Sequence, residues 1–339
     1  MSNARCPSVE GDSGQPRGGL DVLDGSATRL QLLGAIDIHY GLGGLSSEKL
    51  ERASRFAGWL SEHYVQVNDA AAGQLLPSSE PAYLSKIHRR LPNGSVPEDV
   101  FVDFASRMPF SQVLGDLADF GNMRAHDKDA DMRGYIGEAL SPQRGETLLD
   151  AGCSTGRNFL AYVDGVHCIG IDIDLASVLV GAHAWTAQPR NGKPTLCCGS
   201  ILSVPIVDHS IDCVQSLVVL GYTPIRSALK EIRRVLKPGG RLAITLEGPG
   251  FLRELWEGQE ASLKDKLGLA RWYSGTKLQE AGLYWQGSRQ LGRLAGIVLY
   301  TPASISRVLE ANGFEVVDAR TLRDYRGLPR VVGVTARSR

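Results

Sequence analysis

Two aspartates and two glycines in the middle of the chain have the types and spacing of a nucleotide-binding crevice. Asp150 ends the apolar segment Thr147-Leu-Leu, and Gly152 and Gly156 bracket the turn that follows it. A glycine in such a turn lets the backbone take a positive φ and lets a ligand lie close against it. A second apolar segment ends in Asp172, where a carboxylate can accept hydrogen bonds from both hydroxyl groups of a ribose. The pattern predicts a nucleoside-binding crevice in a parallel sheet.

The glycine spacing separates this segment from two other nucleotide-binding motifs. It matches neither the G-x-G-x-x-G fingerprint of dinucleotide-binding folds nor the G-x-x-x-x-G-K-[ST] phosphate loop. Asp150 to Gly156 resembles motif I of the class I S-adenosylmethionine-dependent methyltransferases, D/E-x-G-x-G-x-G, with Ser154 in place of the middle glycine. If that position requires a positive φ, serine carries a strain of about 1 kcal/mol. We expect the loop to tolerate this strain.

Four further segments resemble the same family, in the family's order, so that the resemblance covers about residues 145–337. Gly199 to Val214 resembles G-D-A-x-x-L-P-F-x-D-x-S-F-D-x-V, with Ser200 where the family has an acid that binds the adenine amino group. A serine oxygen accepts that hydrogen bond without a charge, so we expect a weaker contact. The other three segments are 215–222, 235–242 and 301–317.

The resemblance implies S-adenosylmethionine as the cofactor, bound at the carboxyl ends of the central strands. The matching positions would line the methionine and ribose, hold the ribose hydroxyls, frame the adenine and offer a backbone contact to the methionine amino group. They are Asp150, Gly152, Cys153, Ser154 and Gly156 in the loop, Asp172 and Ile173 after the second strand, Ser200 and Ile201 beside the adenine, and Leu217 on the fourth strand.

Methyl transfer from a sulfonium also needs an acceptor aligned with the methyl group and, for a hydroxyl acceptor, a group that removes a proton. Tyr222 lies just past the fourth predicted strand, and Glu247 ends the fifth. His126, followed by Asp127, precedes the helix that leads into the first strand. We therefore take Tyr222, Glu247 and His126 as candidate catalytic residues. The alternatives are packing against a lid for the tyrosine, capping of a loop for the glutamate and a solvated position for the histidine.

The composition narrows the partners that we expect. Lysine plus arginine and aspartate plus glutamate both number 37, so the net charge is zero and nothing in the balance favours nucleic acid or a membrane surface. No apolar stretch approaches the length of a membrane-spanning helix. The six cysteines include no C-x-x-C pair and no Cys/His cluster with zinc spacing. We expect a cytoplasmic chain with free thiols and no metal; its oligomeric state is left open, with a homodimer among the alternatives.

From residue 147 onward, strand-length apolar segments alternate with helical patterns, as in a doubly wound α/β fold. The predicted strands are 147–150, 167–172, 195–198, 211–218, 241–247, 314–319 and 331–336, and the predicted helices are 157–164, 174–187, 224–237 and 302–312. The resemblance implies one Rossmann-like, mostly parallel sheet of seven strands, with the last strand antiparallel.

The remaining sequence predicts three parts. Residues 1–19 are rich in glycine, serine and proline and are predicted to be a disordered tail. Residues 20–140 carry apolar residues at helical spacing, which predicts a helical N-terminal domain. Residues 141–339 would form the S-adenosylmethionine-binding domain. The long connection 248–300 within it predicts a helical lid or a satellite core.

A helical domain and a lid can together enclose an apolar ligand. We therefore expect methyl transfer to a small-molecule acceptor, such as a secondary metabolite, by in-line SN2 attack. Two alternatives stay open: a methyltransferase-like subunit that binds the cofactor without its own turnover, and a protein or RNA methyltransferase. Leu220-Gly-Tyr-Thr stands where a base methyltransferase would have an Asn-Pro-Pro-Tyr-type motif, which argues against base methylation. The sequence does not identify the acceptor, nor whether oxygen, nitrogen or carbon is methylated.

Overall fold

The computed structural model describes residues 47–71, 81–92, 95–107, 110–120, 130–162, 165–189, 192–257 and 297–339. The chain divides into two compact units. The first unit is Met1–Asp127 with Gly152–Val207, and the second is Lys128–Ala151 with Asp208–Arg339. The predicted tail, the catalytic candidate His126 and residues 258–296 of the predicted lid lie outside the described residues.

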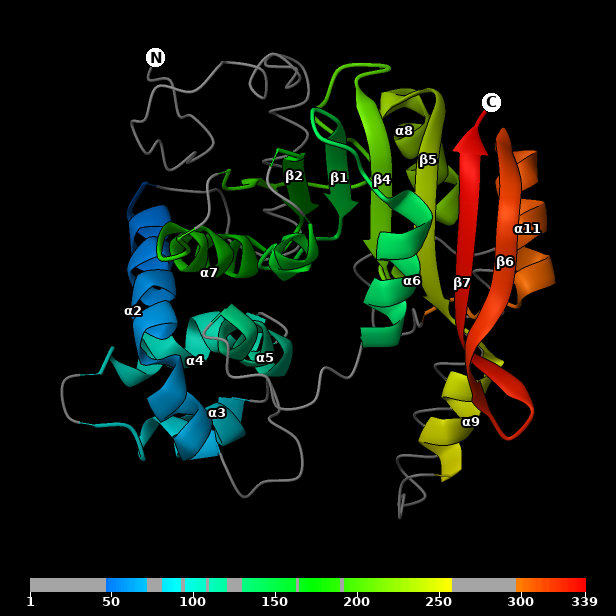
Figure 1. The fold of residues 1–339 in the computed structure, drawn as a ribbon. Coiled ribbons are helices and arrows are strands. Elements are labelled where there is room, and N and C mark those ends of the chain that lie inside the picture. The colour runs from blue at the N-terminus through cyan, green and yellow to red at the C-terminus, as the bar shows by residue number, and fades with distance from the viewer. Residues whose placement is uncertain are drawn as a thin grey trace. The chain divides into compact units, whose positions relative to one another are not determined.

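The strands form one seven-stranded sheet with the order β3-β2-β1-β4-β5-β7-β6 (Figure 1). The parallel pairs include β2–β3, β1–β4 and β4–β5, whereas β7 runs antiparallel to both β5 and β6. This confirms the predicted doubly wound, mostly parallel sheet. The strands are β1 (Thr147–Ala151), β2 (His167–Asp172), β3 (Thr195–Cys198), β4 (Ile211–Leu217), β5 (Leu236–Glu247), β6 (Phe314–Tyr325) and β7 (Leu328–Ser338).

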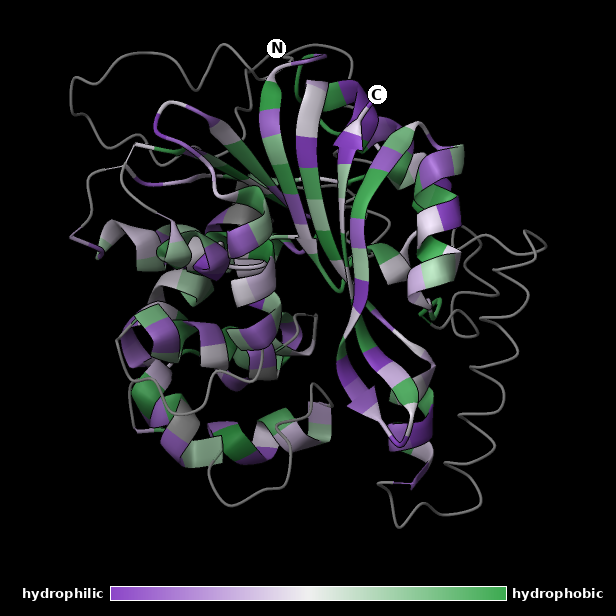
Figure 2. Cartoon of the chain, turned by 45° about the vertical axis from the view of Figure 1, so that its right-hand side comes forward, coloured by the Kyte–Doolittle hydropathy of each residue, from purple (hydrophilic) through white to green (hydrophobic). Residues whose placement is uncertain are grey.

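The first four strands lie where the sequence places them because each is a short apolar run. In a parallel sheet both faces of a strand are covered, and Leu148 and Leu149 of β1 are both fully buried. The last two strands, by contrast, extend well beyond their predicted ends and form a long hairpin. Hydrophobic and hydrophilic residues alternate along this hairpin (Figure 2), as expected where only one face of a strand is covered.

The start of β5 differs from the prediction. The Pro-Gly-Gly sequence was expected to separate a helix from a strand beginning at residue 241, but β5 already begins at Leu236. Ile211 of β4 pairs with Leu236, and Cys213 pairs with Arg241, so the register between the two strands shifts. Proline and glycine therefore lie within a bulged strand, which is one of the places where a sheet tolerates them.

The second unit carries α6 (Ala130–Leu140), α8 (Ile225–Val235), α9 (Pro249–Glu257) and α11 (Pro302–Ala311). In Figure 1, α6 lies on one face of the strands of this unit, and α8 and α11 lie on the opposite face. α11 begins with a capping box in which the side chains of Thr301 and Ser304 each accept a hydrogen bond from the other residue's backbone N–H. The helices near 224–237 and 302–312 are thus confirmed, with α8 ending at the last residue before β5.

The first unit carries α2 (Ser47–Ala71), α3 (Pro81–His88), α4 (Glu98–Arg107), α5 (Phe110–Phe120) and α7 (Leu175–Thr186). Its core is aromatic: the Phe101 ring meets the Phe56 and Phe110 rings edge-on at centroid distances of 6.2 and 5.7 Å. The helical character predicted upstream of β1 is confirmed over the described residues. α6 belongs to the second unit although it precedes residue 141, and the predicted division into domains stays a prediction.

One predicted helix, 157–164, is wrong in type and length. The chain forms only a single 3₁₀ turn there, η1 (Arg157–Ala161). Gly156 precedes it in the left-handed conformation and offers no side chain to cap a longer helix. The tight turn suits a short connection in which i to i+3 hydrogen bonds are sufficient.

A glycine in α7 tests how tightly the chain packs in the first unit. A Cβ atom on Gly181 would lie 2.2 Å from the carbonyl oxygen of Thr155, whereas a Cβ on Gly115 in α5 would meet no atom within 4 Å. We expect Gly181→Ala to destabilise the protein by about 1–3 kcal/mol through overpacking. The matched variant Gly115→Ala should stabilise it by up to about 1 kcal/mol, because alanine favours a helix. Urea unfolding followed by tryptophan fluorescence measures both, and a Gly181→Ala protein as stable as the wild type would contradict this packing.

Candidate functional site

The loop after β1 takes the left-handed backbone conformation at three positions. The φ angles are 92° at Gly152, 51° at Ser154 and 74° at Gly156. Two of these positions are glycines, for which a positive φ carries no penalty from a Cβ atom. Ser154 stands where the family motif has its middle glycine, and it adopts the positive φ that the motif requires. The serine therefore accepts a strain of about 1 kcal/mol.

Backbone hydrogen bonds fasten this loop to the end of β2. The N–H groups of Gly152 and Cys153 both donate to the carbonyl oxygen of Ile171, at 2.8 and 3.1 Å. The loop also lies close against β2, since a Cβ atom on Gly170 would be 2.7 Å from the Cys153 sulfur. Cys153 is buried, so its thiol fills space beneath the loop. The side chain of the last residue of β2 is thereby fixed relative to the loop.

That side chain is the carboxylate of Asp172, which bridges the loop and α7. One oxygen accepts the Ser154 N–H at 2.8 Å, and the other accepts the Asp174 N–H at 2.8 Å. Burial raises the pKa of the Asp172 carboxyl to about 6. The charge of Asp174 also raises this pKa, whereas the backbone N–H groups of Asp174, Ser154 and Ile173 lower it. A carboxylate offers about four lone-pair sites. The carboxylate can therefore hold the loop and still accept hydrogen bonds from a ligand.

The residues predicted to surround the adenine lie on the two segments that follow β2 and β3. Ile173 and Ser200 are partly buried, and Ile201 is 6% exposed. The Ser200 hydroxyl oxygen accepts the Leu202 N–H at 3.2 Å, so it shapes its own turn. Its hydroxyl hydrogen can be donated in another direction. The serine can thus act as a donor at this position, where the family's acid can only accept.

The prediction missed a polar contact between α5 and the loop. Asp116, 5% exposed, accepts a hydrogen bond from the Thr155 hydroxyl at 2.7 Å. The Ser154 hydroxyl makes a longer contact with the same carboxylate, at 3.5 Å. Arg157 forms ion pairs with Asp116 and with Asp119, one helical turn further along α5. The only sequence signal was the pair of aspartates at i and i+3 in this helix, and that spacing does not specify a partner.

In the second unit, two predicted cofactor residues lie on neighbouring strands. Asp150 is fully buried in β1, where it pairs with Gln215 of β4. Leu217 ends β4 and pairs with Thr245 of β5. The chain then turns sharply at Val218, which has a positive φ of 62° and donates its N–H to the Thr245 carbonyl oxygen at 2.9 Å. The predicted backbone contact of Leu217 to the methionine amino group stays a prediction.

The acceptor candidates lie at strand ends of the second unit: Tyr222 comes after β4, and Glu247 is the last residue of β5. Tyr222 closes the 3₁₀ turn η2 (Leu220–Tyr222) and is 49% exposed. Glu247 is 8% exposed and forms an ion pair with Arg330. Arg330 also pairs with Glu254 and lies 4.3 Å from the centre of the Phe251 ring. Partial burial raises the pKa of the Tyr222 phenol, and the charge of Glu247 raises it further, against the effect of Arg330.

Residues 297–300, which end the predicted lid, form hydrogen bonds with the backbone of Gly221, next to Tyr222, and with the backbone of Glu247. Val298 donates its N–H to the Gly221 carbonyl oxygen at 2.8 Å, and Tyr300 donates to the Glu247 carbonyl oxygen at 2.9 Å. A Cβ atom on Gly221 would lie 2.7 Å from the Ile297 side chain, so a larger residue would not fit there. These contacts place residues 297–300 across the ends of β4 and β5, next to the region where an acceptor is expected.

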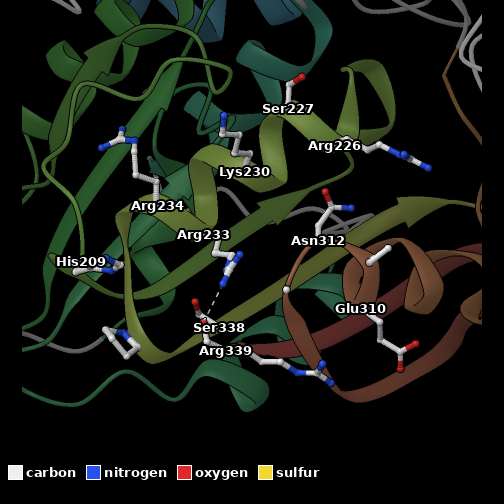
Figure 3. Close-up of a pocket in the computed structure, with 13 residues that line it drawn as sticks. His209, Arg226, Ser227, Lys230, Arg233, Arg234, Glu310, Asn312, Ser338 and Arg339 are labelled. Carbon is white, nitrogen blue, oxygen red and sulfur yellow. Dashed lines mark hydrogen bonds between the residues drawn. The ribbon is translucent and has the colours of Figure 1, made fainter.

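A large hollow in the second unit lies away from these candidates. Its volume is about 870 Å³, and Figure 3 shows its basic lining. It lies at the amino end of β5, whereas Glu247 ends that strand. None of the predicted site residues lines it, and we do not place the reaction there. The lining residues are His209, Arg226, Ser227, Lys230, Arg233, Arg234, Pro238, Glu310, Ala311, Asn312, Gly313, Ser338 and Arg339.

Metal and membrane sites can be assessed for the described residues only. Within the ranges given above, no group of three or more His, Cys, Asp or Glu side chains could hold a metal ion. No described helix is both long enough and apolar enough to cross a membrane. His126 lies outside the described residues, so its role stays a prediction.

The chain is similar to known methyltransferases. Residues 149–244 match a family described as a methyltransferase domain. O-methyltransferase rstn1 of Aspergillus nomiae is 34% identical over 114 residues, which are 32% of this chain and 50% of that protein. Malonyl-[acyl-carrier protein] O-methyltransferase of Serratia marcescens is 32% identical over 136 residues, 39% of this chain and 51% of that protein. The chain thus spans about half the length of the curated relatives it matches.

A solved structure of Haemonchus contortus phosphoethanolamine N-methyltransferase 2 in complex with S-adenosyl-L-methionine is also similar. It shares 15% identity with a TM-score of 0.49, over 73% of this chain and 61% of that one. The family match at residues 149–244 covers the glycine loop, Asp172, the adenine segment and most of β5. Residues 149–244 are therefore a class I S-adenosylmethionine-dependent methyltransferase domain, as the sequence motifs predicted.

The loop in the first unit fits this cofactor. Three left-handed residues bring the backbone into the conformation that the motif requires. The carboxylate of Asp172 accepts the N–H groups of Ser154 and Asp174 and has acceptor capacity left for a ligand hydroxyl group. The glycine at position 156 is required by packing, because a Cβ atom there would lie 2.8 Å from the Leu196 side chain.

The raised pKa of Asp172 generates a pH prediction. The ionised carboxylate is the better acceptor for ribose hydroxyls. Affinity for S-adenosylhomocysteine should therefore be full above about pH 7 and fall as the pH drops through about 6. Stability of the ligand-free protein should change in the opposite sense. Because the folded pKa is above the unfolded value, the contribution of this carboxyl is greatest at low pH and is lost as the pH rises through about 6.

Titration calorimetry and thermal unfolding between about pH 5 and 7.5 measure both trends. Asp172→Asn is the control, because an amide does not titrate. This variant should lack the part of the pH dependence of affinity and of stability that the Asp172 carboxyl contributes. An unchanged pH dependence of affinity in Asp172→Asn would show that another group titrates.

Proposed function

We propose that the chain transfers a methyl group from S-adenosylmethionine to a small-molecule acceptor. The observation that carries the proposal is the carboxylate of Asp172, held beside the left-handed loop by the Ser154 N–H at 2.8 Å. This is where a methyltransferase of this class needs an acceptor for the ribose hydroxyls. The names of the relatives from Aspergillus nomiae and Serratia marcescens, both O-methyltransferases, support an oxygen acceptor.

The residues that would hold the cofactor are those implied by the motifs. Asp172 would accept the ribose hydroxyls, and the partly buried Ile173 would lie against the adenine. Ser200 and Ile201 would frame the adenine edge, with the serine hydroxyl as a donor. The loop residues would line the methionine and ribose, and the backbone at Leu217 would contact the methionine amino group. When bound, S-adenosylmethionine supplies an electrophilic methyl group on its sulfonium sulfur.

The chain's own task is then to orient an acceptor and to take up its proton. A tyrosine phenol is protonated at neutral pH, and the pKa of Tyr222 is raised further by burial. We therefore assign Tyr222 the role of a hydrogen-bond donor that orients the acceptor. Glu247 would accept the proton, since its carboxylate is held in place by Arg330. Residues 297–300, bonded to the backbone of Gly221 and Glu247, would limit access of water to the acceptor.

A cofactor-binding subunit without turnover and a protein or RNA methyltransferase are the alternatives. We propose a cytoplasmic location for the chain. We propose no nucleic-acid, membrane or metal partner. A homodimer stays open, and size-exclusion chromatography with light scattering decides it.

The direct experiment is to incubate the full chain with S-adenosylmethionine and a panel of phenols, enols and carboxylic acids. S-adenosylhomocysteine is quantified by mass spectrometry, and the methylated product is identified. Product formed only with one of these small molecules supports the proposal. Product formed only with tRNA or with a cell-protein fraction would replace it with the macromolecular alternative. Cofactor binding without turnover under any of these conditions would favour the partner subunit.

The acceptor residues should separate from the cofactor residues in their kinetics. Tyr222→Phe and Glu247→Gln should leave affinity for S-adenosylhomocysteine within about threefold but lower turnover by about 10²-fold, because they act on the acceptor. The matched controls are Tyr325→Phe and Glu254→Gln. Tyr325 is a tyrosine bonded to a glutamate elsewhere in the unit, and Glu254 pairs with the same arginine as Glu247. Turnover in both controls should stay within about threefold of the wild type.

Wild-type turnover in both Tyr222→Phe and Glu247→Gln would remove these residues from the reaction. His126 and Asp127 would then be the next positions to vary. A loss of cofactor affinity in either variant would show instead that the residue contacts the cofactor.

A further inference from the structure

Helix α5 contacts the cofactor loop from outside the methyltransferase domain. The domain match begins at residue 149, whereas α5 spans Phe110–Phe120. Its apolar side chains Val113, Leu114 and Leu117 are almost fully buried, and they would suffice to pack the helix. The helix nevertheless also buries the carboxylate of Asp116 at 5% exposure. A buried charge is costly unless hydrogen bonds and ion pairs compensate it. We therefore expect donors and positive charges around the Asp116 carboxylate.

The contacts of Asp116 converge on Ser154 and Thr155 of the loop and on Arg157, the first residue of η1. The Thr155 hydroxyl donates to it at 2.7 Å, the Ser154 hydroxyl lies at 3.5 Å, and the Arg157 guanidinium lies at 3.6 Å. Arg157 is in turn paired with Asp119. A carboxylate that accepts from several donors fixes their relative positions more strictly than apolar packing does. The α5 carboxylate is therefore placed to determine the conformation of the loop.

The loop has a physical need for such support. Ser154 has a φ of 51°, a conformation that is strained for a residue with a side chain. α7 also comes so close to Thr155 that Gly181 has no room for a Cβ, which would lie 2.2 Å from the Thr155 carbonyl oxygen. Thr155 is thus constrained by the hydrogen bond that its hydroxyl donates to Asp116 of α5 and by the backbone of α7. Little freedom is left for Ser154, the residue before it.

The position of Ser154 matters because its N–H holds the carboxylate of Asp172 at 2.8 Å. A chain of contacts therefore runs from Asp116 through Ser154 and Thr155 to the residue proposed to bind the ribose. We propose that Asp116 is a positioning residue for the cofactor: it holds the loop so that the Ser154 N–H stays on Asp172 and the carboxylate faces the ribose hydroxyls. This inference rests on the cofactor site proposed above.

The proposal has a consequence for the pH profile that general destabilisation would not produce. The Ser154 N–H lowers the pKa of the Asp172 carboxyl, against the larger effect of burial, which raises it to about 6. Loosening the loop should remove this hydrogen bond and raise that pKa further. The other titratable or charged groups around this carboxyl are Asp174 at the start of α7 and Cys198, which pairs with Asp172 across β3. Neither contacts Asp116 in the contacts described above, so they should affect variant and wild type alike.

The test compares Asp116→Ala, Asp116→Asn and Asp119→Asn in the full chain, with S-adenosylhomocysteine as the ligand. Asp119→Asn is the matched control, because it removes the same charge from the same helix and from the same arginine but touches neither Ser154 nor Thr155. We expect Asp116→Ala to weaken affinity by about tenfold, and Asp116→Asn by about threefold, since its amide oxygen can still accept the Thr155 hydrogen bond. The affinity of Asp119→Asn for S-adenosylhomocysteine should stay within about twofold of the wild-type value.

The second readout is the pH at which affinity falls to half. It should move up by about half a unit or more in Asp116→Ala and be unchanged in Asp119→Asn. Thr155→Val should reproduce the loss, and combining it with Asp116→Ala should add much less than the sum of the two single effects. If Asp116→Ala does not fold, as judged by circular dichroism, Asp116→Asn and Thr155→Val carry the test.

Two results would overturn the proposal. The first is an equal loss of affinity in Asp119→Asn, which would show that Asp116 acts only by neutralising Arg157. The second is a pH of half-maximal affinity that is the same in Asp116→Ala or Thr155→Val as in the wild type. If the wild type itself binds no S-adenosylhomocysteine, the proposed cofactor site fails and not the loop contact. Carbon-13 NMR of the Asp172 carboxyl in the ligand-free protein then still decides whether Asp116 controls its titration.

Discussion

The backbone between β1 and η1 must turn left-handed three times within five residues, and the rest of the site depends on how the chain maintains that conformation. Glycine meets the requirement at Gly152 and Gly156, but Ser154 meets it at a cost. Hydrogen bonds to Ile171 and to the Asp172 carboxylate fix the loop on the side of β2. The resulting arrangement places a desolvated carboxylate beside three backbone turns, where a nucleoside with two adjacent hydroxyl groups can be recognised.

This constraint connects the methyltransferase domain to residues outside it. Asp116 lies on a helix that precedes the matched family region, yet its carboxylate contacts the loop of that region. On the acceptor side, Glu247 and Arg330 form an ion pair, and both lie beyond the matched residues 149–244. In both cases an arginine pairs with a buried carboxylate. The matched domain therefore contains the cofactor motif, and the segments on either side of it contribute the charged groups around the loop and around the candidate acceptor residues.

The sequence predicted the sheet well because short apolar runs that end in aspartate or glycine have few other interpretations. It predicted less well where proline and glycine lie inside a strand, as at the start of β5, and where a glycine without a capping side chain reduces a helix to the 3₁₀ turn η1. The loop and Asp172 could be predicted from motif spacing. The contacts of Asp116 and Arg330 could not, because they join distant segments and have no local pattern.

A crystal structure of the full chain with S-adenosylhomocysteine tests the cofactor site most directly. Both ribose hydroxyl oxygens should lie within hydrogen-bond distance of the Asp172 carboxylate. The Ser154 N–H should still donate to that carboxylate, and the Thr155 hydroxyl should still donate to Asp116. A ribose held by other residues, or a loop that binds the ligand after releasing Asp116, would contradict this arrangement.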